Sequence, residues 1–259
     1  VTFSPLMVNQ IGSYNRNELI KKGFDAIFIS PNQNVAKKLS KRFFIERGNP
    51  KVAWDAGVNT IPVQVAVNYN IPLIFYAEHG ESEYGGKILN EESQKIKDFT
   101  EVIEHKIGDD PRNWEMEGVS QKDLNPYLYP SQDKIDTVGV KSMYFAYFHR
   151  WSMFENYNYI REKIDFKTSS HRTCGTFTDF DSLDDKIDCL YYYMQYIKFG
   201  MGRATWDAAQ EIRTNIINRD EGIALVKKYD HEYPKIYFND ILEYLSISEH
   251  VQTDPSRSK

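Results

Sequence analysis

The chain has 259 residues, 41% hydrophobic and 27% charged, which suits a globular protein of one large or two small domains. Its net charge of −5 does not favour non-specific binding to nucleic acid or to an anionic membrane surface. No stretch approaches the roughly 18–20 apolar residues that cross a bilayer, and the two cysteines make no disulfide framework, so a cytoplasmic location is expected.

The first part of the chain alternates between strand-like and helix-like segments. The predicted strands are Val1–Phe3, Phe24–Ser30 and Ile71–Ala77, and the predicted helices are Asn17–Lys22, Val35–Arg47 and Gly57–Asn70. Pro62 is expected in the first turn of the third helix, where its missing N–H does no harm. This order predicts a parallel sheet with helices on its faces.

The second part becomes helical. Glu91–Gly108 has a helical pattern, Val138–Trp151 is the last strand candidate, and helical patterns continue from Glu155 onward. We therefore predict an α/β layer over residues 1–151 and a mostly helical region packed on it over residues 152–259. Because the chain begins with Val1 rather than Met, inside a strand-like segment, we expect it to be truncated at its N-terminus.

The stretch "IPLIFYAEHGESEYGG" ends an apolar strand in a group of ionisable side chains. In parallel sheets, ligands bind beyond the carboxyl ends of the strands, which is where Glu78 and His79 are delivered. Carboxylates there suit Mg²⁺ on nucleotide phosphates, and a histidine suits proton transfer or the handling of ammonia. A solvated acidic loop is the alternative.

A second candidate site is "KFGMGRAT", residues 198–205, which lies just before a helix. Lys198 and Arg203 supply positive charge, Gly200 and Gly202 allow tight backbone geometry, and Thr205 is a plausible N-cap. The combination predicts an anion site. The alternative is a structural role for two glycines at a corner between helices.

Two weaker candidates remain. His171 and Cys174 lie close together in "HRTC", but no second pair stands at zinc spacing, so no metal site is predicted. Trp151 ends the last strand candidate, where an aromatic side chain stacks on a base or a sugar or else belongs to the core.

Three long segments carry a resemblance to a known family. "IPVQVAVNYNIPLIFYAEHGESEYGG", "KFGMGRATWDAAQEIR" and "NRDEGIALVKKYD" resemble the N-acetyl sugar amidotransferase family of surface-polysaccharide biosynthesis, which contributes to lipopolysaccharide and nonulosonic-acid glycans. The resemblance runs from about Val1 to about Ser248. It implies an ATP pyrophosphatase (PP-loop) domain of the adenine nucleotide α-hydrolase type. This is an α/β fold of three layers, in which helices cover both faces of a parallel sheet.

The resemblance also implies an activity. ATP, with Mg²⁺, adenylylates the oxygen of an acetamido group on a nucleotide-linked sugar, and ammonia from a glutaminase and cyclase-like partner pair displaces AMP to leave an acetamidino group. In this family context, Glu78 and His79 are expected beside the activated amide. The expected nucleotide- or substrate-binding residues are Glu81, Tyr84, Trp151, Lys198, Gly200, Gly202, Arg203 and Thr205.

The chain departs from the family in two places. The PP-loop pattern S-G-G-x-D-S is absent, and Gly85-Gly86 is preceded by Tyr84 and followed by Lys87. Many relatives carry Cys-x-x-Cys where this chain has Lys51 to Trp54, so a thiol or metal role does not transfer to that point. The missing loop is expected on a strand upstream of Val1.

Two other classes of function stay open. A non-catalytic relative would keep the nucleotide-sugar-binding half and act in binding or assembly. A metal hydrolase would use Glu78, His79 and His171, although no second motif supports it. The resemblance leaves the sugar, its carrier nucleotide and the oligomeric state undefined.

Overall fold

The structure, a computed structural model, describes residues 1–77, 95–97 and 107–247. Its strands are β1 (Thr2–Phe3), β2 (Phe28–Ile29), β3 (Leu73–Tyr76) and β4 (Lys141–Tyr144). The helical elements before β4 are α1 (Gln10–Lys21), α2 (Gln33–Arg47), α3 (Val52–Asn68), the 3-10 helices η2 (Pro111–Trp114) and η3 (Gln121–Tyr127), and α7 (Gln132–Val138). The helices after β4 are α8 (Phe145–Phe148), α9 (Met153–Lys163), α10 (Asp188–Phe199), α11 (Arg203–Arg213), α12 (Arg219–Tyr229) and α13 (Phe238–Leu245).

The strands pair in parallel, as the sequence predicts. Thr2 lies opposite Phe28 in the β1–β2 pair, and Leu73 lies opposite Lys141 in the β3–β4 pair. Within the described residues these pairs are two separate two-stranded sheets. The protein is therefore a helix-rich α/β structure, and the described residues do not show the expected three-layer fold around one sheet.

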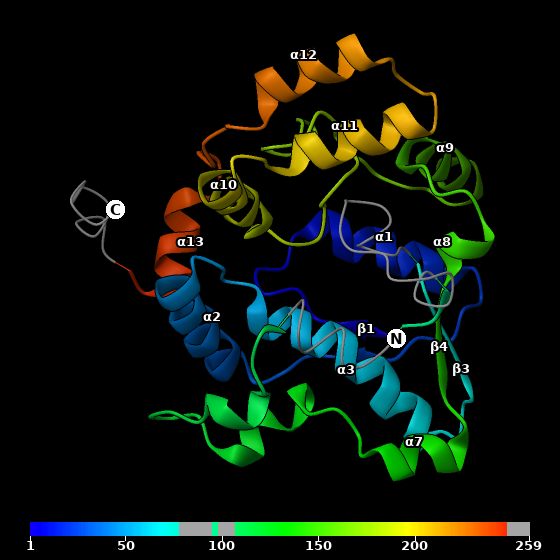
Figure 1. Cartoon of the computed structure of the whole chain (residues 1–259), viewed down its shortest axis with the longest axis vertical. Helices are drawn as coiled ribbons and strands as arrows, with labels where there is room; N and C mark the ends of the chain where they lie inside the picture. Colours follow the sequence, from blue (N-terminus) through cyan, green and yellow to red (C-terminus); the bar gives the residue numbers. More distant parts are fainter. Residues whose placement is uncertain (78–94, 98–106, 248–259) are drawn as a thin grey trace.

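Helix α3 connects the two sheets because both pack against it (Figure 1). Phe3 of β1 lies so close to α3 that a Cβ on Gly57 would come within 2.2 Å of its ring, so only glycine fits there. On the other side, the Tyr76 hydroxyl of β3 donates to the Asn59 carbonyl of α3 at 3.0 Å. The same helix therefore positions the carboxyl ends of both sheets.

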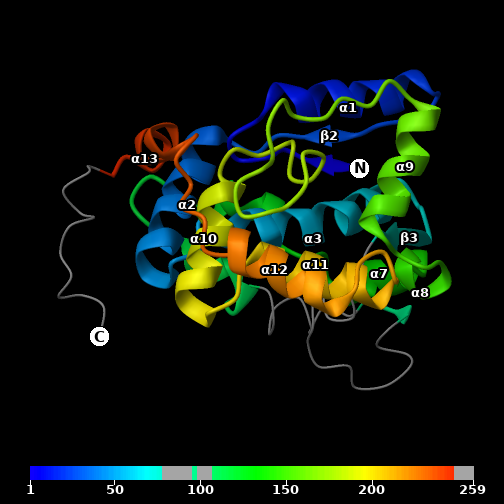
Figure 2. The same ribbon diagram turned by 90° about the horizontal axis from the view of Figure 1, so that it is seen from above.

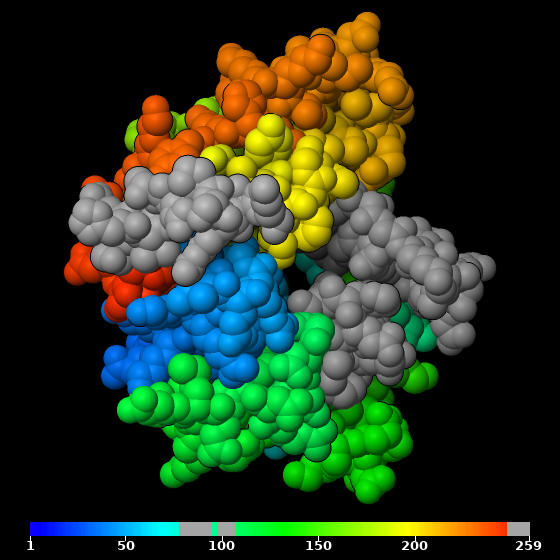
Figure 3. Space-filling view, turned by 60° about the vertical axis from the view of Figure 1, so that its left-hand side comes forward, coloured from blue at the N-terminus to red at the C-terminus, as the bar shows by residue number. Residues whose placement is uncertain are grey.

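The main core surrounds α2 and α3. Phe43 of α2 packs edge-on against Trp114 of η2, with ring centroids 4.9 Å apart, and both side chains are fully buried. A smaller cluster joins α2 to α10 and α13 through Ala36, Leu190 and Ile241. Figure 3 shows α2 in blue between the C-terminal helices above it and the green segment of η2, η3 and α7 below it.

Several predicted elements differ in extent. α3 begins at Val52 rather than at Gly57, so Pro62 lies in the interior of the helix and not in its first turn. β2 covers two residues of the expected strand Phe24–Ser30, and the expected strand Val138–Trp151 contains β4 followed by the short helix α8. Most of the helix predicted at Glu91–Gly108 lies outside the described residues, although Ile96 bridges to Met143 of β4.

The apolar run Ile71–Ala77 predicts a central strand buried on both faces, and this prediction is wrong for β3. Leu73 is 45% exposed and Phe75 is 52% exposed, while Ile74 and Tyr76 face α3 and are half-buried. Phe145 and Phe148 of α8 pack edge-on against Phe75, but they leave about half of its side chain exposed. The apolar sequence fits a central strand, but its neighbours do not enclose it.

The C-terminal helices form as predicted. α11 and α12 lie side by side, and a Cβ on Gly222 of α12 would come within 2.7 Å of Ile212 of α11 (Figures 1 and 2). α12 begins with a capping box, in which Asn218 and Glu221 each bond to the other's backbone N–H. Among the described residues, no helix has the length and apolar character needed to cross a bilayer.

Candidate functional site

Four predicted site residues lie outside the described part of the chain. These are Glu78, His79, Glu81 and Tyr84. The last described residue before them is Ala77, whose carbonyl accepts a hydrogen bond from the Ala146 N–H at 3.0 Å. The roles expected of the four residues therefore stay predictions.

Two other predicted residues, Trp151 and Arg203, line one cavity of about 350 Å³, which we call the Arg203 cavity. Its other described lining residues are Met153, Asn156, Tyr157, Ile160, Phe166, Phe180, Asp181 and Gln210. Trp151 follows β4 and α8 in the chain.

Helical spacing places the lining side chains on common faces. Met153, Asn156 and Ile160 of α9 are separated by three, four and seven positions, so they lie along one side of that helix. α9 begins after Ser152, a fully buried N-cap whose hydroxyl accepts the Glu155 N–H at 3.3 Å. Arg203 and Gln210, seven positions apart, are presented in the same way by α11.

Two carboxylates and a tyrosine hydroxyl surround the guanidinium of Arg203. Its Nε donates to Asp207 Oδ1 at 2.7 Å, its Nη1 lies 3.4 Å from the Tyr192 hydroxyl, and its Nη2 lies 4.0 Å from Asp181 Oδ1. Asp207 is fully buried, one turn along α11. Within the described residues, two carboxylates therefore surround this guanidinium.

The predicted anion site at the start of α11 is filled by the protein's own carboxylate. Asp230, just beyond α12, accepts the Gly202 N–H at 2.7 Å and the Thr205 N–H at 2.9 Å, and the Thr205 hydroxyl donates to it at 2.7 Å. The predicted N-cap is wrong, because Gly202 and not Thr205 precedes the first helical residue. A Cβ on Gly202 would come within 2.9 Å of the Asp230 carbonyl, which explains the glycine.

The other predicted members of that loop point elsewhere. The Lys198 ammonium donates to the Arg47 carbonyl at the end of α2, at 2.8 Å, and does not line the Arg203 cavity. Gly200 ends α10 with φ of 72°, a left-handed conformation that favours glycine. The structure thus supports the alternative of two glycines at a corner between helices, and ligand binding by Lys198, Gly200, Gly202 and Thr205 stays a prediction.

The cavity also contains residues that the sequence did not single out. Asn156 has a buried side-chain nitrogen with no hydrogen-bond partner in the described part of the chain. Tyr157 and Phe180 stack face to face, 4.2 Å apart and within 4° of parallel. The i, i+3, i+7 pattern of α9 is a signal for its lining residues, but no local pattern predicts that Phe180 and Asp181 join them from a distant loop.

A second cavity, of about 330 Å³, adjoins the first. Ile160, Phe166 and Phe180 line both cavities. The second cavity also contacts Thr2 and Pro5, at and just beyond β1, and Gly12 and Arg16 of α1. The two cavities therefore extend from the end of β4 to the end of β1.

The start of α11 offers no free N–H groups to a phosphate. The N–H groups of Gly202 and Thr205 are taken by Asp230, and Arg203 is paired with carboxylates. Within the described ranges, no three His, Cys, Asp or Glu side chains converge as a metal site requires. Binding of ATP and Mg²⁺ stays a prediction.

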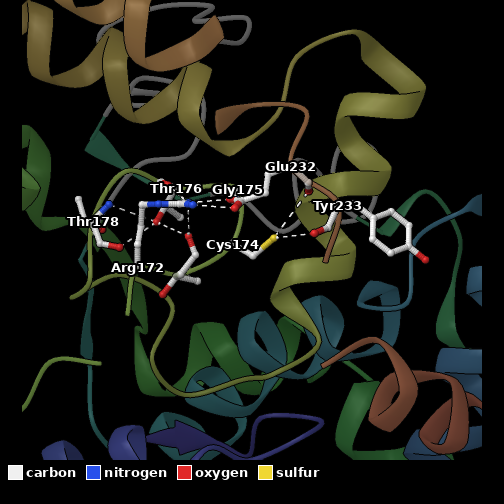
Figure 4. A network of polar contacts seen from close by, with 8 residues as sticks. Arg172, Cys174, Gly175, Thr176, Thr178, Glu232 and Tyr233 are labelled. Carbon is white, nitrogen blue, oxygen red and sulfur yellow. Dashed lines mark hydrogen bonds and ion pairs between the residues drawn. The ribbon is translucent and has the colours of Figure 1, made fainter. Parts of the chain in front are cut away.

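A polar clamp joins the loop around Arg172 to Glu232, which follows α12 (Figure 4). Arg172 binds both carboxylate oxygens of Glu232 at 2.6 Å, and the Gly175 N–H donates to the same carboxylate at 2.9 Å.

Cys174, in the same loop, is a protonated thiol, because a hydrogen bond with Cys189 and burial raise its pKa above the usual value. Its sulfur lies 3.4 Å from the Tyr233 carbonyl. Cys174 is thus a structural residue.

Glu232→Gln should lower the free energy of unfolding by about 1–2 kcal/mol at pH 7, because it removes a charged, bidentate hydrogen-bonded pair. Burial would raise the pKa of Glu232, but Arg172 and the Gly175 N–H outweigh it and hold the pKa below its usual range. The stabilisation is therefore complete above the unfolded-state pKa of about 4.3 and is lost as the pH falls through the lower folded-state pKa.

Urea unfolding between pH 7 and pH 3 checks this prediction. The difference between Glu232→Gln and the parent should shrink as the pH falls below about 4.3. Glu243→Gln, on the exposed side of α13, is the control and should match the parent throughout. A difference that persists unchanged at pH 3 would contradict an ionic clamp.

Comparison with known families identifies the C-terminal helices. Residues 174–252 match the family described as LPS biosynthesis protein WbpG-like, C-terminal domain. This region is similar to a lipopolysaccharide biosynthesis domain. No match to a curated protein was found. The WbpG-like region supplies Phe180, Asp181, Arg203 and Gln210 to the cavity, and the match supports a role in lipopolysaccharide biosynthesis.

Proposed function

We propose that the chain is part of an ATP-dependent amidotransferase that converts the acetamido group of a nucleotide-linked sugar to an acetamidino group. Ammonia comes from a glutaminase-type partner, and the product enters a surface polysaccharide made in the cytoplasm. The observation that carries the proposal is the match of residues 174–252 to a lipopolysaccharide biosynthesis domain. The resemblance of the longer segments to N-acetyl sugar amidotransferases supplies the reaction type.

The arrangement of the two sheets supports a PP-loop architecture. The Thr2 N–H donates to the Ile27 carbonyl and the Ser4 N–H to the Ile29 carbonyl, so the backbone groups of Phe3 point to the opposite edge of β1. By the same alternation, Leu73 and Phe75 turn their backbone groups away from β4. Neither edge has a hydrogen-bond partner among the described residues, and both strands pack on α3. We assign the strand that carries the pyrophosphate loop to the space between them.

In this proposal, the reacting group and the rest of the substrate are bound at two different places. Glu78 and His79 follow β3 directly, next to the proposed strand, where a carboxylate and an imidazole can take protons from attacking ammonia. The Arg203 cavity, which is lined by Trp151 after β4 and α8, receives another part of the substrate. The proposal requires both places to be occupied by one nucleotide-sugar.

Glu78→Gln should reduce kcat/KM for amidation by about 100-fold or more while leaving the melting temperature nearly unchanged. The assay uses the full-length gene product with its ammonia-supplying partner, and mass spectrometry detects the loss of oxygen and gain of nitrogen in the sugar. Glu162→Gln, on an exposed position of α9, is the matched control and should keep full activity. A large fall in melting temperature would instead make Glu78 a structural residue.

The alternative function is a non-catalytic relative that binds the nucleotide-sugar or assists assembly. In this alternative the protein has no S-G-G-x-D-S loop, a pattern that these 259 residues do not contain. Titration of the full-length product with ATP and Mg²⁺ separates the two functions. Saturable ATP binding supports the amidotransferase, whereas sugar binding without ATP binding supports the alternative.

A further inference from the structure

The second cavity, of about 330 Å³, has a cationic side chain in its wall, and we call it the Arg16 cavity. Gly12, Arg16 and Leu19, at positions i, i+4 and i+7 of α1, lie along one face of that helix and line the cavity. Thr2 of β1 also lines it and lies beside Phe28 in the parallel β1–β2 pair. The carbon of the Arg16 guanidinium stands 4.3 Å from the centre of the Phe28 ring.

The guanidinium of Arg16 is available to an anion. Within the described part of the chain, Arg16 lies over the Phe28 ring and forms neither a hydrogen bond nor a salt bridge. A contact with a ring face uses none of the five guanidinium N–H groups in a conventional hydrogen bond. The ring therefore holds the guanidinium in place while its N–H groups stay free to bind a carboxylate through two parallel hydrogen bonds.

Asp184 brings the opposite charge to the same cavity. A Cβ on Gly12 would come within 2.5 Å of the Asp184 Cβ, so the glycine is explained by the packing of Asp184 on α1. Asp184 forms no salt bridge with a described residue, because Lys51, the cation that acts on it through space, contacts Asp188. Gly12 and Arg16 are one helical turn apart, about 5.4 Å. The two opposite charges thus border the cavity at neighbouring positions and do not pair.

The remaining described lining is mainly apolar. Ile160 of α9 and Ile164 just beyond that helix form one side, and the segments that follow contribute Phe166, Phe180 and Leu183. A volume of about 330 Å³ is at the lower end for ligand sites, so the cavity suits a small molecule. An apolar wall beside two unpaired, opposite charges favours a ligand that carries one anion, one cation and an apolar body.

We propose that the Arg16 cavity binds an α-amino acid with an apolar side chain in its zwitterionic form. Arg16 binds the carboxylate, Asp184 accepts hydrogen bonds from the ammonium, and the side chain packs on the apolar wall. Desolvation raises the pKa of Asp184, and the ammonium of the ligand would stabilise its charged form. The inference does not depend on the proposed function. Because Phe180 lines both cavities, the bound amino acid would also contact a wall of the Arg203 cavity.

Calorimetry and saturation-transfer NMR on the 259-residue chain at neutral pH test the inference. The probes are L-leucine and L-phenylalanine. Each is compared with its primary amide, which lacks the carboxylate, and with the corresponding deaminated acid, which lacks the ammonium. At least one amino acid should bind saturably, with its side-chain protons receiving the strongest saturation. Its amide and its deaminated acid should each bind about tenfold more weakly or worse, because each loses a charge-assisted hydrogen bond.

Two substitutions test the assignment of the charged groups. Arg16→Met and Asp184→Asn should each weaken binding of the amino acid about tenfold or more, with an unchanged helix content by circular dichroism. Arg219→Met and Asp179→Asn are the matched controls, because both residues are exposed and neither lines the cavity, and they should bind like the parent. The comparison of each amino acid with its amide and deaminated acid needs no substitution, so it decides the inference even if a variant fails to fold.

Three results would overturn the inference. The first is that neither amino acid binds saturably. The second is equal binding of the amino acid, its amide and its deaminated acid, which would indicate an apolar site without a role for the two charges. The third is binding that persists unchanged in both Arg16→Met and Asp184→Asn, which would place the amino acid elsewhere on the protein.

Discussion

Lys51→Met should lower the free energy of unfolding by about 3–5 kcal/mol, the largest effect we expect from one substitution in this chain. The Lys51 ammonium contacts the Asp188 carboxylate, and both side chains are 7% exposed. It also lies 3.9 Å from the centre of the Trp54 ring. Burial opposes the charge on Lys51, but the carboxylates of Asp188 and Asp185 outweigh burial and raise the pKa of Lys51. Without Lys51, the charge on Asp188 is buried and unpaired.

Urea unfolding followed by circular dichroism measures the loss. Lys186→Met is the matched control, because Lys186 pairs with Asp240 at 3.2 Å but the two side chains are 32% and 56% exposed. An exposed pair of this kind contributes about 0–1 kcal/mol. The double variant Lys51→Met, Asp188→Leu should be more stable than Lys51→Met alone, because it leaves no buried charge. Equal losses for Lys51→Met and Lys186→Met would contradict the prediction.

Asp230→Ala should lower the free energy of unfolding by about 2–4 kcal/mol. The Asp230 carboxylate is almost fully buried and accepts three hydrogen bonds, from the Gly202 N–H, the Thr205 N–H and the Thr205 hydroxyl. Its removal leaves buried donors unsatisfied at the N-terminus of α11, where a negative charge also interacts favourably with the helix dipole. Thermal and urea unfolding both report the loss.

Asp220→Ala serves as the control for that substitution. Asp220 lies in the first turn of α12 and is exposed, so it interacts with a helix terminus mainly through charge. Its loss should cost a few tenths of a kcal/mol, at most about 1 kcal/mol. An Asp230→Ala variant that unfolds like Asp220→Ala would show that water or another group replaces the carboxylate without cost.

The sequence predicts helices well where their ends are encoded locally. Asn32 accepts the backbone N–H of Asn34 at the start of α2, and Gly48 ends that helix with φ of 60°. The sequence predicts the surroundings of strands poorly. The apolar run at β3 fits a buried strand, yet its exposure depends on the elements packed beside it, which its own residues do not specify.

In the candidate site, too, local sequence predicts some features, whereas contacts between distant segments are not predicted. Trp151 and Arg203 can be named from residue type and position, and the Arg203–Asp207 pair follows from i, i+4 spacing on a helix. Asp230 stands 25 residues beyond Thr205, and nothing in either segment predicts their contact. Whether the start of α11 is an open anion site or a satisfied helix end is decided by that tertiary contact. Residue type alone therefore does not reveal that the N–H groups at the start of α11 already have a partner.

The contact of Asp230 with α11 also makes the two C-terminal helices one cooperative unit. Asp230 follows the last turn of α12, and its carboxylate accepts hydrogen bonds from backbone N–H groups at the start of α11. If the end of α12 frays, these N–H groups therefore lose their acceptor. Arg203 is the first residue of α11. Local opening of α12 would therefore also loosen the first turn of α11, which holds Arg203 in the cavity wall, although α12 itself contributes no lining residue.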